Sequence, residues 1–362
     1  MSETEPVAIN PEMVILAREA DGLTQTQLAD RVGIAQGKLS RLESQPGFVS
    51  VDQTFVRRLS EELGRTSSFF TRPGRRHSGT GVTEIYHRKR ESTPKKQLAR
   101  LHATIDTIRI HVEELLKHID LHSEYTFPHI DVDDPLETQE PADIARLVRA
   151  TWRVPSGPVN NLTELVEGAG GLVFNLDFET TLLDAVSRWY PGLPPMFFLN
   201  SKLTGDRYRY TLAHEVGHMV MHIRPNAMME TQADTFAAEL LMPAAEISPS
   251  LRNVTLPLLA RLKPYWKVSM AALLKRAGDL GRLTPNQQRY MWSKFSALGF
   301  RTREPQELDI PVERPTLLRS ILDACTTQMG WTTRDLETHL LTSESRLRPI
   351  YFRDQTSLRV VR

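Results

Sequence analysis

Apolar residues recur at helical spacing along most of the chain, and the pattern is most regular in its first 64 residues. There it predicts short helices over residues 11–20, 25–32, 35–43 and 52–63. Thr24 suits the N-cap of the second helix and Gly33 marks its end, so a turn of about three residues leads to the third helix. Two short helices joined by a tight turn with a glycine form a helix-turn-helix, whose second helix enters the DNA major groove.

The stretch LTQTQLADRVGIAQGKLSRLES, residues 23–44, resembles the phage-repressor (XRE-type) helix-turn-helix family, and the resemblance covers roughly residues 9–64. It implies a double-stranded DNA operator as partner, with Gln25 on the phosphate backbone. Ala35 departs from the family's usual Ser or Thr cap, which leaves the base contacts open. A protein-interaction module of four helices is the alternative. Side chains that suit bases or phosphates are expected to be exposed on the third helix: Gln36, Lys38 and Arg41.

Residues 65–130 are expected to form a basic linker and a long amphipathic helix. Residues 65–100 carry ten Lys and Arg against two Glu, a local charge of +8, which suits either phosphate binding or a solvated linker. The apolar pattern then predicts one helix over residues 93–121, packed on the next domain or on a second copy in a homodimer. Its histidines lack carboxylates at matching positions, so we expect them to face the surface or a partner: His102, His111, His118 and His122.

The middle of the chain alternates between helical and strand patterns. Helices are predicted over residues 142–152 and 159–169, and the segments GGLVFNL, LDAVSRWY and PMFFLN are predicted as strands bounded by Gly and Pro. PMFFLN could be an edge strand that aligns a substrate backbone by strand addition. A helix containing YTLAHEVGHMVMH, residues 210–222, follows. The chain is therefore predicted to be α+β and predominantly helical, with one small sheet before this helix.

The His-Glu-x-x-His pattern on that helix is suited to a metal. His214 and His218 are four residues apart, so they lie on one face about 6 Å apart along the axis and can address one ion. Glu215 would sit beside the ion and hold the attacking water. A catalytic zinc needs three protein ligands and an open position. His222 lies about 12 Å along the axis from His214, too far to be that third ligand, so we expect it to pack or to cap the helix.

The third ligand is sought in ETQADTFAAELLMP, residues 230–243. Glu230 would complete a set of two histidines and one glutamate, and Asp234 could accept the other ring N–H of His214 and so fix its tautomer. This Glu-x-x-x-Asp arrangement is that of thermolysin-type (gluzincin-like) zincins. Glu239 lies on a different face of this helix and is the alternative candidate for the third ligand. An apolar helix with stray histidines, or a metal site without activity, are the alternatives.

RYTLAHEVGHMVMH followed by ETQADTFAAELLMP resembles the ImmA/IrrE family of metallopeptidases over about residues 140–245. The resemblance implies that His214, His218 and Glu230 bind Zn²⁺ and that Glu215 is the general base. Familiar relatives often carry Glu where this chain has Gln232, which favours Glu230 as the ligand.

The resemblance also implies a role for the chain. A DNA-binding regulator would cleave a repressor- or antitoxin-like protein, or its own helix-turn-helix domain, and so relieve repression in stress, prophage or mobile-element control. The alternatives are a regulator whose metal site is structural or sensory and cuts nothing, and a housekeeping peptidase whose N-terminal domain only contacts proteins.

Composition limits the chemistry that is available to the chain. The net charge of +1 does not by itself indicate a nucleic-acid-binding protein. Cys325 is the single cysteine, so an internal disulfide is excluded and a metal must be bound by histidines and carboxylates. The acidic first residues and the lack of a long apolar stretch lead us to expect no signal peptide, no membrane span and a cytoplasmic protein.

We divide the 362 residues into five parts, and the resemblance to long peptidase relatives reaches about Pro305. These parts are a helix-turn-helix domain (1–64), a linker and long helix (65–130), a metallopeptidase domain (131–250), its helical extension (251–305) and a helical module of open role (306–362).

Overall fold

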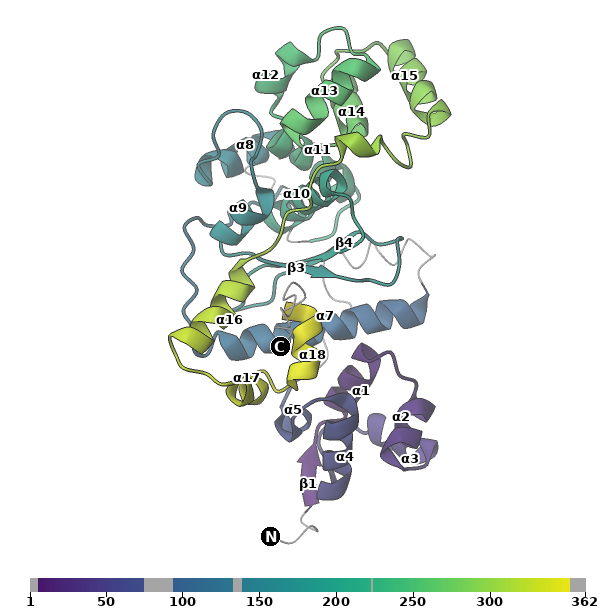
Figure 1. Ribbon diagram of the computed structural model, residues 1–362, viewed down its shortest axis with the longest axis vertical. Coiled ribbons are helices and arrows are strands. Elements are labelled where there is room, and N and C mark those ends of the chain that lie inside the picture. The colour runs from purple at the N-terminus through teal and green to yellow at the C-terminus, as the bar shows by residue number, and fades with distance from the viewer. Residues whose placement is uncertain (1–5, 75–93, 133–138, 223, 352–362) are drawn as a thin grey trace, which may run out of the picture.

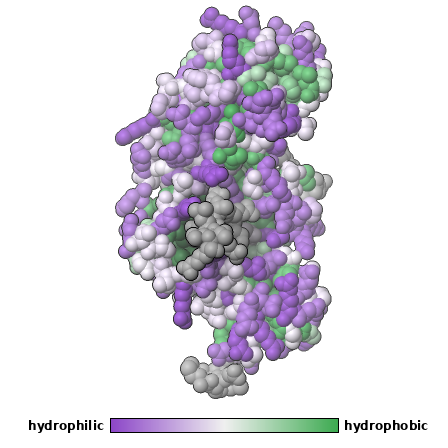
Figure 2. Space-filling model, viewed as in Figure 1, coloured by the Kyte–Doolittle hydropathy of each residue, from purple (hydrophilic) through white to green (hydrophobic). Residues whose placement is uncertain are grey.

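The computed structural model describes residues 6–74, 94–132, 139–222 and 224–351. Most of the basic stretch predicted to bind phosphate or form a linker therefore lies outside the described residues, as does the end of the C-terminal module. The described residues are mostly helical, and hydrophilic residues predominate on the face shown in Figure 2. No helix in these ranges is long and apolar enough to cross a membrane.

The N-terminal bundle confirms the four predicted helices to within a residue or two at each end. Thr24 and Gln27 form a capping box at the start of the second helix, and Gly33 ends it with a φ of 69°. Ala35 makes no side-chain capping bond at the start of the third helix, because a methyl group cannot accept a hydrogen bond. The bundle consists of α1 (Pro11–Ala20), α2 (Gln25–Val32), α3 (Gln36–Glu43), α4 (Gln53–Leu63), α5 (Ser67–Thr71) and an antiparallel pair, β1 (Pro6–Ile9) and β2 (Val49–Asp52).

The long helix α7 (Lys95–Leu115) lies between this bundle and the sheet of the next domain (Figure 1). Ala103 and Ile110 pack into the core of the bundle, whereas Ile105 and Ile108 pack beneath the sheet. The helix is shorter than predicted. The bonds from Lys117 N to Glu114 O and from His118 N to Leu115 O span three residues, so the helix tightens and ends there.

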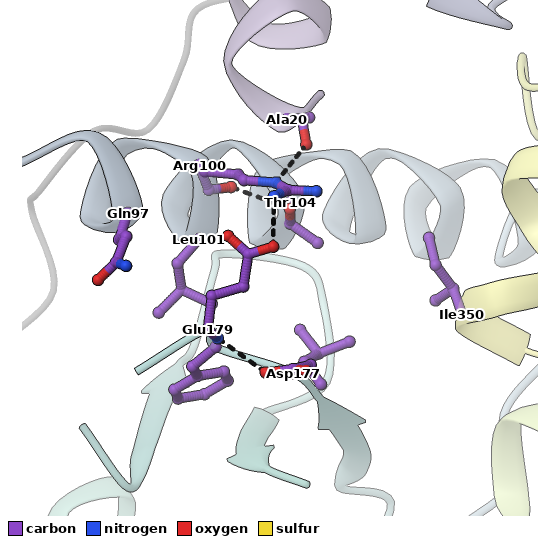
Figure 3. A pocket seen from close by; sticks show the side chains of 10 residues that line it. Ala20, Gln97, Arg100, Leu101, Thr104, Asp177, Glu179 and Ile350 are labelled. Atoms are coloured by element: carbon purple, nitrogen blue, oxygen red, sulfur yellow. Dashed lines mark hydrogen bonds and ion pairs between the residues drawn. The ribbon is translucent and has the colours of Figure 1, made fainter. Parts of the chain in front are cut away.

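Figure 3 shows where the bundle, α7 and the sheet meet, around a cavity of about 280 Å³. Arg100 of α7 donates from Nε to the carbonyl oxygen of Ala20, at 3.3 Å, and pairs with the carboxylate of Glu179 in the loop after the first strand of the sheet. One side chain of α7 thus contacts both of its neighbours.

The sheet consists of β3 (Leu172–Leu176), β4 (Ala185–Arg188) and β5 (Met196–Asn200), in the order β3-β5-β4. β5 runs parallel to β3 and antiparallel to β4. The prediction that PMFFLN is an edge strand is therefore wrong, because this segment forms the central strand. Phe197 and Phe198 point to opposite faces and are both fully buried, which is typical of a strand covered on both sides.

One core connects the sheet to the helices above it, and the helical extension belongs to that core. Leu273 and Leu274, in the segment WKVSMAALLKRAGDLG, are fully buried in the same hydrophobic core as Leu212 and Val216, so this segment packs against the peptidase domain as expected. The helices are α8 (Pro141–Thr151), α9 (Leu162–Gly168), α10 (Gly205–Met221), α11 (Met229–Leu241), α12 (Ala244–Ile247), α13 (Leu256–Trp266), α14 (Met270–Asp279) and α15 (Pro285–Ala297), with short 3₁₀ turns at Ser248–Ser250 and Gln306–Leu308.

The C-terminal module runs back along the molecule as α16 (Leu317–Thr327), α17 (Thr333–His339) and α18 (Glu344–Tyr351) (Figure 1). α16 contacts β3 and α17 contacts α7. Glu167 accepts hydrogen bonds from the backbone N–H groups of Thr316 and Leu317, which fixes the start of α16 to the peptidase domain.

The C-terminal module also overturns the predicted exposure of His111. This side chain is fully buried, with Nε2 3.0 Å from Thr342 Oγ1 and Nδ1 2.6 Å from Tyr351 Oη. The prediction is wrong because the residues that cover α7 at this point lie more than 200 positions later in the chain. His118, by contrast, is exposed, with its ring beside Trp331 and His339.

Candidate metal centre

The helix α10 is held on the sheet by its apolar residues. Leu212, Val216 and Val220 are fully buried in the core above the sheet. The positions between them turn toward β4 and α11, and these positions carry the His-Glu-x-x-His residues. The rotation of the helix is therefore set by packing, and the polar groups are presented at its sides.

Three of the predicted site residues meet at one point. His214 Nε2 lies 3.0 Å from His218 Nε2, and the two carboxylate oxygens of Glu230 lie 3.5 Å from these nitrogens. All the donor atoms fall within 4.8 Å of one another. A tetrahedral zinc with bonds of about 2.0–2.1 Å places neighbouring ligand atoms roughly 3.4 Å apart, so this donor set fits the ion.

Glu230 reaches the histidines because α10 and α11 pack very closely. A Cβ added at Gly217 of α10 would lie 3.0 Å from the ring of Phe236 in α11. Only a glycine allows this approach without displacing the ring. The side chain of Glu230 is 47% exposed and that of His218 is 2% exposed, so the site opens to solvent on the α11 side.

Asp234 and the charges around it favour a cation at the site. Asp234 Oδ1 lies 3.1 Å from His214 Nδ1, and Lys275 Nζ lies 2.8 Å from Oδ2. Burial opposes a charge on His214, but its bonds to Asp234 and Glu230 prevail and raise its pKa to about 9. Hydrogen bonds to His214 first and to His218 second hold the pKa of Glu230 far below its usual range. A metal ion would replace the proton that these carboxylates attract.

Glu215 is buried beside the edge strand, next to a residue that the sequence did not single out. Ser187 of β4 donates a hydrogen bond from Oγ to Glu215 Oε2. Ser187 faces α10 because side chains alternate along a strand, with Ala185 on the same face and Val186 on the other. The sequence of β4 gives no signal for this contact, because the strand also contains the buried Arg188 and Ser187 does not stand out as its polar residue.

Glu239, the alternative candidate for the third ligand, lies outside the cluster of His214, His218 and Glu230. Its side chain is 3% exposed and pairs with Arg276 and, at 3.0 Å, with Arg146. Among the described residues it does not join the cluster of donor atoms. It stabilises the packing of α11 on α8 and α14 instead.

Two of the four predicted DNA-contacting residues, Gln25 and Gln36, are hydrogen-bonded to each other. Gln36 Nε2 donates to Gln25 Oε1 at 3.0 Å, and Gln25 Nε2 donates to Glu43 Oε2 at 2.8 Å. Glu43 is held in turn by two bonds from Arg18, at 2.7 and 2.9 Å. The remaining two residues, Lys38 and Arg41, are exposed on α3.

Comparison with known families matches two parts of the chain. Residues 14–70 match the helix-turn-helix family, and residues 166–277 match a peptidase family described as the IrrE N-terminal-like domain. The chain combines an XRE-type helix-turn-helix domain with an IrrE-like metallopeptidase domain. No curated protein matches it.

The two matches place the site within the peptidase domain. The IrrE-like match begins in α9 and ends in α14, so it includes the sheet, both metal-site helices and part of the predicted helical extension. The helix-turn-helix match continues to Phe70 in α5, beyond the predicted boundary at residue 64. The chain therefore has a DNA-binding domain and a peptidase-like domain with a cluster that fits a metal site.

Proposed function

We propose that this protein is a transcription regulator whose IrrE-like domain is a zinc-dependent endopeptidase. The observation that carries the proposal is that His214, His218 and Glu230 converge on one point, with the Glu215 carboxylate near enough to interact electrostatically with His214. This is the ligand number and donor chemistry of a catalytic zinc site with an open position. The cofactor is Zn²⁺, and the DNA-binding domain brings the enzyme to an operator.

The chain's own residues have separate tasks in this reaction. A zinc ion held by His214, His218 and Glu230 would lower the pKa of a water molecule and polarise the scissile carbonyl. Glu215 would act as general base: the carboxylate oxygen not bonded to Ser187 would take a proton from the attacking water and deliver it to the leaving amine. Asp234 holds His214 with its Nε2 toward the site. Within the described part of the chain, β4 pairs on one side only, so its outer edge is available to the backbone of a substrate.

The arrangement of the domains bears on what is cleaved. The metal site lies above the sheet, whereas the helix-turn-helix bundle lies beyond α7 on the opposite side (Figure 1). Cleavage of the bundle by its own chain would require the two parts to separate. This supports cleavage of another molecule, either a repressor- or antitoxin-like protein or a second copy of this chain.

Two measurements test the proposal. Elemental analysis should find near one zinc per chain, lost in His214→Ala and Glu230→Ala. Cells carrying Glu215→Gln should retain zinc in this protein but lose a cleavage product that the parent generates, detected by comparing protein N-termini. Unchanged N-termini together with normal promoter control would favour the alternative, a regulator with a structural or sensory metal site. Absence of salt-dependent DNA binding would instead favour a housekeeping peptidase.

A further inference from the structure

A line of hydrogen-bonded polar groups, buried at the two histidines and half-buried at its far end, leads away from the candidate metal site through His218. Its Nδ1 lies 3.0 Å from Nδ1 of His222, and Nε2 of His222 lies 3.0 Å from Oε1 of Gln232. Asn226 Nδ2 donates to the same oxygen at 3.1 Å. His218 is 2% exposed and His222 is 6% exposed, so water competes little for these bonds. The line joins the end of α10 to α11 through groups that no family match assigns.

The direction of these bonds follows from the metal site. For His218 Nε2 to bind a metal, its lone pair must be free, so the ring proton is on Nδ1. His222 Nδ1 must then accept that proton in a hydrogen bond, which places the proton of His222 on Nε2. That proton is donated to Gln232 Oε1, an oxygen that can only accept. This arrangement gives each of these donors an acceptor.

We propose that His222 is a positioning residue for the metal centre, because it fixes the tautomer and ring orientation of His218. The inference rests on the proposed metal site and deepens it. The two ligand histidines are held by different chemistry: His214 by the carboxylate of Asp234, and His218 by a neutral imidazole that is itself oriented by Gln232.

The backbone at His222 places the ring for this task. α10 ends there, with His222 at φ −113° and ψ 97° and its N–H still bonded to His218 O at 3.1 Å. A residue that only capped the helix would need that backbone bond alone. The imidazole makes two further bonds in series, which packing does not require.

Variants at two positions test the assignment by zinc affinity, measured against a competing chelator. His222→Phe removes the acceptor and should weaken zinc binding by about 10–100-fold, the usual range for groups that orient metal ligands. Gln232→Leu leaves His222 Nε2–H without its acceptor and should weaken binding in the same direction. Gln232→Glu keeps an acceptor oxygen and should bind zinc at least as tightly as the parent. His122→Phe, at an exposed histidine away from this line, is the matched control and should bind like the parent.

A spectroscopic readout separates orientation from a general loss of structure. Nitrogen NMR of the zinc-loaded parent should show His222 protonated on Nε2, and the visible absorption of cobalt-loaded His222→Phe should differ from that of the parent. If His222→Phe does not fold, the zinc affinities of the variants at the half-buried Gln232 and the NMR measurement on the parent still test the inference. Parent-like zinc affinity in folded His222→Phe, or a His222 proton on Nδ1, overturns the inference. A parent that binds no zinc overturns the proposed metal centre itself, while a parent that binds zinc without cleaving any protein overturns only the peptidase.

Discussion

Arg346 of the C-terminal helix α18 pairs with Asp21 at the end of α1, with Nη2 and Oδ2 2.5 Å apart. Backbone bonds accompany the pair, because Thr66 N donates to Leu341 O and Ser343 N donates to Gly64 O, each at 3.0 Å. The C-terminal module thus fastens the DNA-binding bundle to the body of the protein. Burial raises the pKa of Asp21 more than Arg346 lowers it, so the carboxylate depends on its partner.

Arg346→Ala should therefore destabilise the protein by roughly 1–2 kcal/mol, less than for a fully buried pair because the Arg346 side chain is 38% exposed. Arg348→Ala is the matched control on the same helix. Its pair with Glu344 is largely exposed, and its loss should change the free energy of unfolding by less than about 0.5 kcal/mol. Urea unfolding of both variants makes the comparison, and equal effects would show that the Asp21 contact does not fasten the bundle.

Ser187→Ala should lower kcat without removing zinc. The substitution deletes the hydroxyl that bonds Glu215 Oε2, so the proposed base loses its fixed orientation. We expect a fall of about 10–100-fold in kcat, with KM and zinc content close to those of the parent. The substrate is the protein identified by the Glu215→Gln comparison. Ser201→Ala, at an exposed serine just after β5, serves as control, and a parent-like kcat in Ser187→Ala would exclude the orienting role.

Local signals predicted most of the fold, and the errors arose where distant segments meet. The start and end of α2 follow from Thr24 and Gly33, which act within a few residues of themselves. The position of β5 in the sheet depends on two strands whose pairing the apolar pattern does not encode. The sequence around His111 predicts a surface residue, because Thr342 and Tyr351, which bury its side chain, are more than 200 positions later in the chain.

The clustering of His214, His218 and Glu230 was more predictable than the surroundings of these residues. The spacing of His214 and His218 in a helix, and of Glu230 and Asp234 in the next, is a local property of each helix. Ser187 could not be recognised, since its contact with Glu215 depends on how β4 docks against α10.

Lys38 and Arg41 should contribute to DNA affinity in a way that depends on salt. Both are exposed on α3, and each phosphate contact removed should weaken binding across sequences and lower the salt slope by about 1. Gln36→Ala should instead relax sequence preference, at a cost of about 1–3 kcal/mol for the preferred site. Binding to an operator selected from random DNA, followed from 50 to 200 mM salt, measures both effects. Lys117→Ala, exposed beyond the end of α7, should leave both quantities unchanged.

His111 should make the protein less stable in mild acid. Burial first, and the charge of Arg65 second, lower the pKa of His111 to about 3 from an ordinary 6.5. The unfolded chain therefore takes up a proton below pH 6.5 that the folded chain refuses until about pH 3, so stability present above pH 6.5 is lost as pH falls. At pH 5 this group alone should lower the free energy of unfolding by about 2 kcal/mol relative to neutral pH.

His111→Gln tests this directly, since the amide can bond Thr342 or Tyr351 but does not titrate. Its free energy of unfolding should change less between pH 7.5 and pH 5 than that of the parent, by about 2 kcal/mol. His122→Gln, which replaces an exposed histidine, should follow the parent. If His111→Gln and the parent lose stability equally over this range, the acid sensitivity arises from other groups, and the buried His111 does not couple the C-terminal module to pH.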